Sequence, residues 1–304
     1  QSNSVGASFV AGVSMTDNVA TVDITETVSV NAQNITAETN TRSQITAVGD
    51  ASAGIIGGAS GALAASVGVL NNKSKTTITD SSNLNASGDI DITADSEVSS
   101  LFAARATQDS DFNQTVQDKF DAGVDSTTEL DVDFMGFNVG DFLKTSVGGF
   151  MTTFEDSMSS PDASDETVFQ LGGALVFGKV TNDTEAVVAS ALTDTVGTGP
   201  TLTSAGTTNI EAQGTTQSQS FASGRTNNPN YGGQAGIAIQ IVDTSLKATI
   251  GGGGTTTNIN ATDLNLLAQT ISDSASARDQ NSMGVFASSG LGGGGSDGSG
   301  VGVA

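Results

Sequence analysis

The pattern of apolar and polar residues along the chain predicts β-strands. In the segment LNASGDIDITADS (84–96), Ile90, Ile92 and Ala94 alternate with polar residues, which is typical of a strand with one buried face. Similar segments recur as AQNITAETN, TTNIEAQGT and DLNLLAQTI. None of them has the i, i+3, i+4 spacing of apolar residues that a helical repeat requires.

These four segments are copies of one repeat. The alanines that align them are Ala37, Ala94, Ala212 and Ala268. They lie 57, 118 and 56 residues apart, so the long interval holds one further period and an insertion of about 60 residues. Repeats of fixed period stack so that each unit covers the apolar face of its neighbour. We therefore expect a buried column made of Ile35, Ile92, Ile210 and Leu266.

Other parts of the unit recur as well. Upstream of the repeated segment lies a strand rich in small residues, and then a strand with the sequence KTTITD, EAVVAS or KATIGG, which aligns Lys75 with Glu185 and Lys247. Downstream, a Ser-, Thr- and Ala-rich strand ends near an arginine in each unit. We expect these arginines to form a row and to pair with acidic residues or carbonyls between rungs: Arg42, Arg105, Arg225 and Arg278.

The stacked architecture that fits this repeat is all-β, a parallel β-helix. A propeller blade would need tight hairpins and aromatic signatures, whereas aromatic residues make up only 5% of the chain. In a β-helix, small or branched residues point inward, while Thr, Ser and Asn face solvent or form ladders between equivalent positions. Each unit is expected to supply two or three rungs of the helix.

The unit ALAASVGVLNNKSKTTITDSSNLNASGDIDITADS resembles the repeats of very large bacterial exoproteins of the leukotoxin and filamentous-haemagglutinin-like adhesin kind. The resemblance covers residues 1–108 and 169–304, which we expect to be β-helix repeats. It implies a right-handed β-solenoid and a structural or adhesive role in a secreted bacterial cell-surface protein or extracellular filament. The opening NSVGASF and the closing GSGVGVA are similar, which favours a segment of a longer repeating polypeptide.

An acidic insertion at 109–168 interrupts the repeats. It contains 14 acidic residues and two lysines, and nine of the 13 phenylalanines lie between Phe102 and Phe169. Two amphipathic helices are expected, at 111–121 and 140–158, so the insertion is predicted to be mainly α-helical. Three roles remain open: a helical hairpin packed on the solenoid wall, a docking face for another chain, and an amphipathic element with membrane affinity.

Composition and charge narrow the possible partners. The formal net charge of −23 repels nucleic-acid phosphates and anionic lipid. The chain has no cysteine or histidine, which excludes disulfides and thiolate or imidazole metal sites, and no apolar run is long enough to span a bilayer. Expected partners are other copies or neighbouring repeats stacked end to end, and a protein or glycan on a host or neighbouring cell surface. We expect an extracellular location.

Calcium is the one cofactor that the sequence suggests. Glu129, Asp131 and Asp133 alternate in ELDVDF and would share one face of a strand, where a cation would offset their repulsion. Asp297 lies in GGGGSDG, which partly matches the glycine-rich calcium repeat of β-rolls. The alternatives are a solvated acidic face and an ordinary glycine-rich turn.

A β-helical carbohydrate-active enzyme, a polysaccharide lyase or hydrolase, is the alternative function. Asp89 and Asp91 are candidates for its paired carboxylates. The aromatic platforms of a sugar cleft are scarce, however, since Tyr231 is the only tyrosine. We therefore expect no enzymatic activity. A calcium-stabilised filament subunit is the remaining alternative.

Overall fold

The computed structural model describes most of the repeat region. The described residues are 4–25, 27–52, 58–79, 81–107, 133–134, 137–138, 169–189, 199–227, 231–251, 256–270, 282–292 and 299–303. The helices expected at 111–121 and 140–158 lie outside these residues. Within the insertion, β7 (Asp133–Phe134) and β8 (Phe137–Asn138) are described, and they pair antiparallel.

All other strands belong to three parallel sheets. Sheet A contains β1 (Ser4–Ile24), β4 (Gly58–Ile78), β9 (Phe169–Val188), β12 (Tyr231–Ile250) and β16 (Ser299–Val303). Sheet B contains β2 (Ser29–Ala32), β5 (Asn83–Ala86), β10 (Thr201–Ser204) and β13 (Asn258–Asn260). Sheet C contains β3 (Ile35–Ser52), β6 (Ile90–Thr107), β11 (Thr207–Asn227), β14 (Asp263–Thr270) and β15 (Ser282–Gly292).

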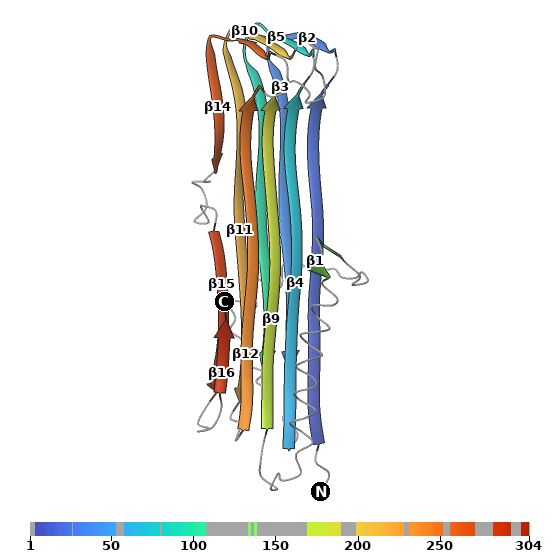
Figure 1. Ribbon diagram of the computed structural model, residues 1–304, viewed down its shortest axis with the longest axis vertical. Helices are drawn as coiled ribbons and strands as arrows, with labels where there is room; N and C mark the ends of the chain where they lie inside the picture. Colours follow the sequence, from blue (N-terminus) through green and yellow to red (C-terminus); the bar gives the residue numbers. More distant parts are fainter. Residues whose placement is uncertain are drawn as a thin grey trace.

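The chain coils through these sheets as a parallel β-solenoid, as the sequence predicts. In each coil the chain runs along a long strand of sheet A, crosses through a short strand of sheet B, and returns along sheet C (Figure 1). The coils stack side by side, so the axis of the solenoid is perpendicular to its strands. Strands of successive coils pair side by side and in parallel, for example β1 with β4 and β4 with β9. The two long sheets bury the core between them.

The predicted number of rungs per unit is wrong. One unit forms one rung, because two strands of 18 to 21 residues and a four-residue strand use up the repeat. The small residues and Asn71–Asn72 of the second unit are typical of corners, which favours shorter strands. In the structure they lie inside β4, where Asn72 points into the core with its hydrogen bonds satisfied.

The predicted alignment is confirmed for three of the four members of the column, but the predicted burial is confirmed for Ile92 and Ile210 alone among these three, since Leu266 is half exposed. Ile210 pairs with Ile92 on one side and with Leu266 on the other. Ile35 instead pairs with Ile90, so Ala37 takes the place beside Ile92. A shift of two residues preserves the alternation of inward and outward side chains, so the hydrophobic pattern cannot detect it.

Two of the four arginines, Arg42 and Arg105, form the predicted ion pairs between rungs, but the described arginines do not form one row. Arg42 lies beside Glu97 and forms an ion pair with it. Arg105 lies eight positions further along the β3–β6 register, where it holds Asp50 through two hydrogen bonds of 2.7 and 3.0 Å. In the strand register, Arg225 lies beside Gly290, two positions beyond the column of Arg105. Arg278 lies outside the described residues.

The core has two apolar clusters separated by a polar seam. One cluster, near sheet B, is built on Ile92, Leu84 and Ile210, and the other is built on Phe102, Leu70 and Val176. The polar seam consists of inward side chains from both long sheets: Asn18, Thr39, Thr41, Ser43, Asn72, Ser74, Asn182, Thr184 and Thr216. Hydrogen bonds between them compensate for their removal from water.

Candidate interaction surfaces

The outer face of sheet A has an apolar half. Inward and outward residues alternate, so the neighbours of Leu70 and Asn72 on β4 point away from the core. In the first half of each strand these outward residues are apolar. They form what we call the apolar patch: Phe9, Val13, Met15, Leu63, Val67, Val69, Leu175, Phe177, Ile237, Ile239 and Ile241. The run ALAASVGVL, apolar at inward and outward positions alike, is the sequence signal for it.

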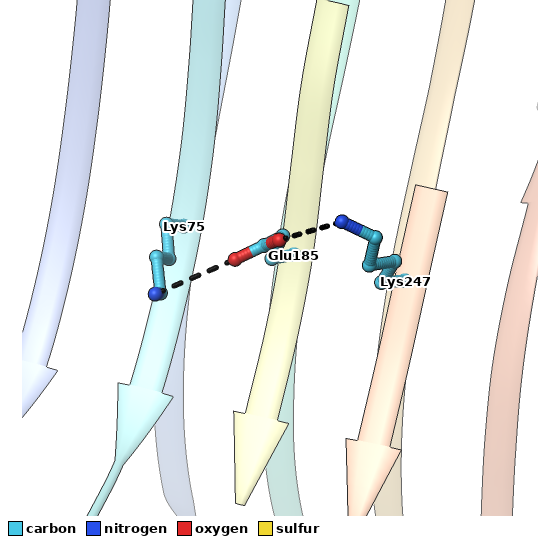
Figure 2. A network of polar contacts seen from close by, with 3 residues as sticks. All are labelled: Lys75, Glu185 and Lys247. Atoms are coloured by element: carbon cyan, nitrogen blue, oxygen red, sulfur yellow. Dashed lines mark hydrogen bonds and ion pairs between the residues drawn. The ribbon is translucent and has the colours of Figure 1, made fainter. Parts of the chain in front are cut away.

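The second half of the same face is charged. Lys75, Glu185 and Lys247 occupy equivalent positions on β4, β9 and β12, as the sequence alignment predicts. The carboxylate of Glu185 lies between the two ammonium groups (Figure 2), with Nζ···O distances of 3.4 Å to Lys75 and 3.1 Å to Lys247. One acid thus joins three rungs of the solenoid.

The two lysines determine how Glu185 titrates. Burial raises the pKa of this carboxyl, but the hydrogen bond from Lys247 and the positive charges of Lys75 and Lys247 outweigh it, so the pKa lies below its ordinary value. The same hydrogen bond and charge raise the pKa of Lys247. Because the folded pKa of Glu185 is depressed, its contribution to stability is present at neutral pH and is lost as the pH falls through that pKa.

We expect Glu185→Gln to lower the free energy of unfolding at pH 7 by about 1 kcal/mol, since the pairs are partly exposed. The difference from the parent protein should shrink as the pH falls through the depressed pKa of Glu185, because the carboxylate then takes up a proton. Urea unfolding between pH 3 and pH 8 measures it. Glu97→Gln, which breaks the more exposed pair with Arg42, is the matched control and should cost less. A pH-independent loss would contradict this account.

The outer face of sheet C carries polar ladders. Asn209 donates a 2.6 Å hydrogen bond to Asp91 and accepts one of 2.8 Å from Asn265. At the adjoining corner, Oδ1 of Asp89 accepts the backbone N–H of Thr207 at 2.8 Å. Asp89 and Asp91, the candidate catalytic carboxylates, each accept a hydrogen bond that joins two rungs. Their geometry supports a structural role.

Burial raises the pKa of Asp95 on this face, and the negative charges of Glu38 and Glu211 raise it further. Within the described parts of the chain, no group of three or more carboxylate side chains is arranged to hold a metal ion. Of the predicted calcium ligands, Glu129, Asp131 and Asp297 lie outside the described residues. Asp133 is described through its backbone in β7 alone. The calcium site stays a prediction.

The first and last rungs of the stack present strand edges that no other described strand pairs with. Among the described strands, β1, β2 and β3 pair on one side only, with β4, β5 and β6. At the opposite end, β13 and β14 pair on one side only, with β10 and β11. The inward-facing Leu264 and Leu266 of β14 are about half exposed there, whereas Ile210 in the rung below is fully buried.

No protein family, curated protein or solved structure matches this chain. Among the residues that the structure describes, none forms a helix with the length and apolarity needed to cross a membrane. The candidate interaction sites that the described geometry provides are the open edges of the first and last rungs and the two halves of the outer face of sheet A.

Proposed function

We propose that the chain is a rod-forming segment of a right-handed β-solenoid in a secreted bacterial cell-surface protein or extracellular filament, of the leukotoxin and filamentous-haemagglutinin-like adhesin kind. Its role is structural and adhesive, without enzymatic turnover. The observation that supports this proposal is a regular stack of rungs whose first and last strands have edges that no other described strand pairs with. Unpaired edges are templates for additional strands.

The two ends match in chemistry as well as in backbone geometry. Close to sheet B, the first rung of the stack presents Ile24, Val30 and Ile35 toward the core. The fourth rung presents at the same column positions Ile250, Ile259 and Leu264. A further rung of the same repeat would therefore continue each apolar column. Such a rung can come from a neighbouring repeat of a parent protein or from another copy.

Assembly of the purified chain tests this proposal. We expect sedimentation velocity to show larger species as concentration rises, and electron microscopy to show stacks that grow along the solenoid axis, perpendicular to the strands, at constant width. Leu266→Asp places a carboxylate in an apolar column that stacking would bury, so it should abolish this growth. Leu267→Asp changes the adjacent residue, which points outward, and is the matched control. Monomers at every concentration, or equal effects of both substitutions, would contradict end-to-end stacking.

The adhesive part of the proposal concerns the walls of the rod. With a net charge of −23, the chain is best suited to basic or neutral partners, such as a protein or glycan on a host or neighbouring cell. The outward Asn and Asp ladders of sheet C offer regularly spaced hydrogen-bonding groups to such a partner. No described observation favours catalysis over this role.

A further inference from the structure

Exposed apolar side chains gather on the first and last rungs of the stack. We call the first rung, with β1, β2 and β3, the head, and the last rung, with β12, β13, β14 and β15, the tail. Among the described residues, every large hydrophobic side chain that is exposed lies on one of these two rungs, which favours them as the surfaces that association buries. They are Phe9, Val10, Met15, Val19 and Val28 at the head, and Ile237, Ile239, Ile241, Leu264, Leu266, Leu267, Met283 and Phe286 at the tail.

The ladder of amides in the polar seam has a direction. Nδ2 of Asn18 donates to Oδ1 of Asn72 at 3.1 Å, and Nδ2 of Asn72 donates to Oδ1 of Asn182 at 2.9 Å. Each amide thus donates toward the tail. Both hydrogens of the Asn18 amide are used, because Nδ2 also donates to Ser43, whereas no described residue donates to its Oδ1. The head therefore presents a hydrogen-bond acceptor at the polar seam.

Thr244 ends the same column at the tail. It lies beside Asn182 in the register, and its hydroxyl lies 3.2 Å from Oγ1 of Thr216. A hydroxyl both donates and accepts, so Thr244 can turn its hydrogen toward an oxygen of a further rung and accept a bond from Thr216. The tail thus offers the donor that the head lacks. Two heads would offer each other amide oxygens and no donor.

Charge distinguishes the same two arrangements. The charged residues of β1 are Asp17 and Asp23, whereas β12 carries Asp243 and Lys247. If the register of the rungs continues from a tail to a head, Asp17 lies beside Asp243, and Lys247 lies diagonal to Asp23. The attraction of the second pair opposes the repulsion of the first. Two heads would have no lysine or arginine in β1 to oppose their four acids.

We infer that the partner of the head is the tail of a second copy, docked in parallel with the register of the rungs continued. Thr244 of one copy then donates to Oδ1 of Asn18 in the next, and the polar seam runs through the junction. This inference rests on the stacking proposed above and specifies its partner, direction and register. A head-to-tail contact leaves a free head and a free tail, so copies add along the solenoid axis.

One described strand has to move for this contact. β16 pairs with Gly233–Ile237 of β12, where residues 7–11 of an incoming β1 would lie. β16 occupies five positions of β12, whereas the incoming β1 pairs with all 20. We therefore expect the longer strand to displace the shorter one.

Disulfide formation between copies tests the direction and the register, because the chain contains no cysteine. Met15 and Ile241 are exposed outward residues of one column, at the head and the tail. Within one chain two strands separate them, so a disulfide cannot join them, but at a head-to-tail junction they lie on adjacent strands. We expect Met15→Cys/Ile241→Cys to form disulfide-linked multimers on oxidation. Met15→Cys/Lys247→Cys, which is out of register by about 20 Å, should link at least about tenfold more slowly.

The single-cysteine variants are the controls for direction. Disulfide-linked dimers of Met15→Cys would show that heads pair with heads, and dimers of Ile241→Cys that tails pair with tails. Either result overturns the inference and leaves stacking intact, as do equal rates in and out of register, or stacks in which 15 and 241 do not link. Monomers in sedimentation velocity at every concentration overturn stacking as well.

A second pair of variants tests the polar seam at the junction. Thr244→Val removes the hydroxyl at nearly unchanged size and should raise the dissociation constant of stacking about tenfold, which corresponds to one lost hydrogen bond. Thr249→Val changes an exposed outward residue of the same strand and is the matched control. Circular dichroism of the dilute proteins checks that both variants fold. Equal dissociation constants would overturn the role of Thr244 as the donor to Asn18, and with it the inference.

Discussion

Replacing Asn72 by leucine is expected to lower the free energy of unfolding by about 3–6 kcal/mol, although the two side chains are similar in size. Asn72 uses its full hydrogen-bonding capacity inside the core. Its Oδ1 accepts bonds from Asn18 at 3.1 Å and Ser43 at 2.8 Å. Its Nδ2 donates to Thr41 at 3.0 Å and Asn182 at 2.9 Å. Leucine would remove the hydrogen bond that each of these four partners makes with Asn72. These bonds connect three rungs across both long sheets.

Asn71→Leu is the matched control, because Asn71 is the adjacent residue of the same strand and points outward. Its replacement should change stability by less than about 1 kcal/mol. Equilibrium unfolding in guanidinium chloride, followed by circular dichroism, compares the two variants. Equal losses at 71 and 72 would mean that the polar seam contributes no more than the surface does.

The repeat pattern in the sequence predicts some features of the fold and not others. The strand type, the parallel stacking and the alignment of Lys75 with Glu185 and Lys247 follow from the repeat pattern, and the structure confirms them. That same alignment places Asn72 beside Asn182, so the ladder of buried amides is encoded in the sequence. The length of the rungs is not, because asparagine is typical of corners unless tertiary partners satisfy it inside a strand.

The candidate surfaces were predictable to different degrees. The outward apolar residues follow from the continuous run at 62–70, since alternation is lost where both faces of a strand are covered. The two-residue error at Ile35 arose because Ile90 and Ile92 fit the same inward position equally well. The roles of Asp89 and Asp91 depend on hydrogen bonds to a rung more than 100 residues away, which local spacing cannot reveal.

Phe102→Ala is expected to cost about 3–5 kcal/mol, the usual loss for a fully buried aromatic ring. Phe102 is the largest fully buried side chain described, in an apolar cluster whose other buried members are alanine, valine, leucine and isoleucine. The two glycines that face it, Gly68 on β4 and Gly178 on β9, leave the room that its ring fills. Leu101→Ala, which truncates the outward neighbour, is the control and should cost about 1 kcal/mol. Similar losses at 101 and 102 would contradict this packing.

The ring and the facing glycines should behave as one unit in a double-mutant cycle. A Cβ at Gly68 would overlap the ring of Phe102, so Gly68→Ala alone should be strongly destabilising. In the Phe102→Ala background the same methyl group enters the vacated space, and its cost should fall by more than about 1 kcal/mol. Unfolding of the four proteins in guanidinium chloride gives this coupling. Additive effects of the two substitutions would show that the close contact between the ring of Phe102 and Gly68 does not determine the packing of sheet A on sheet C.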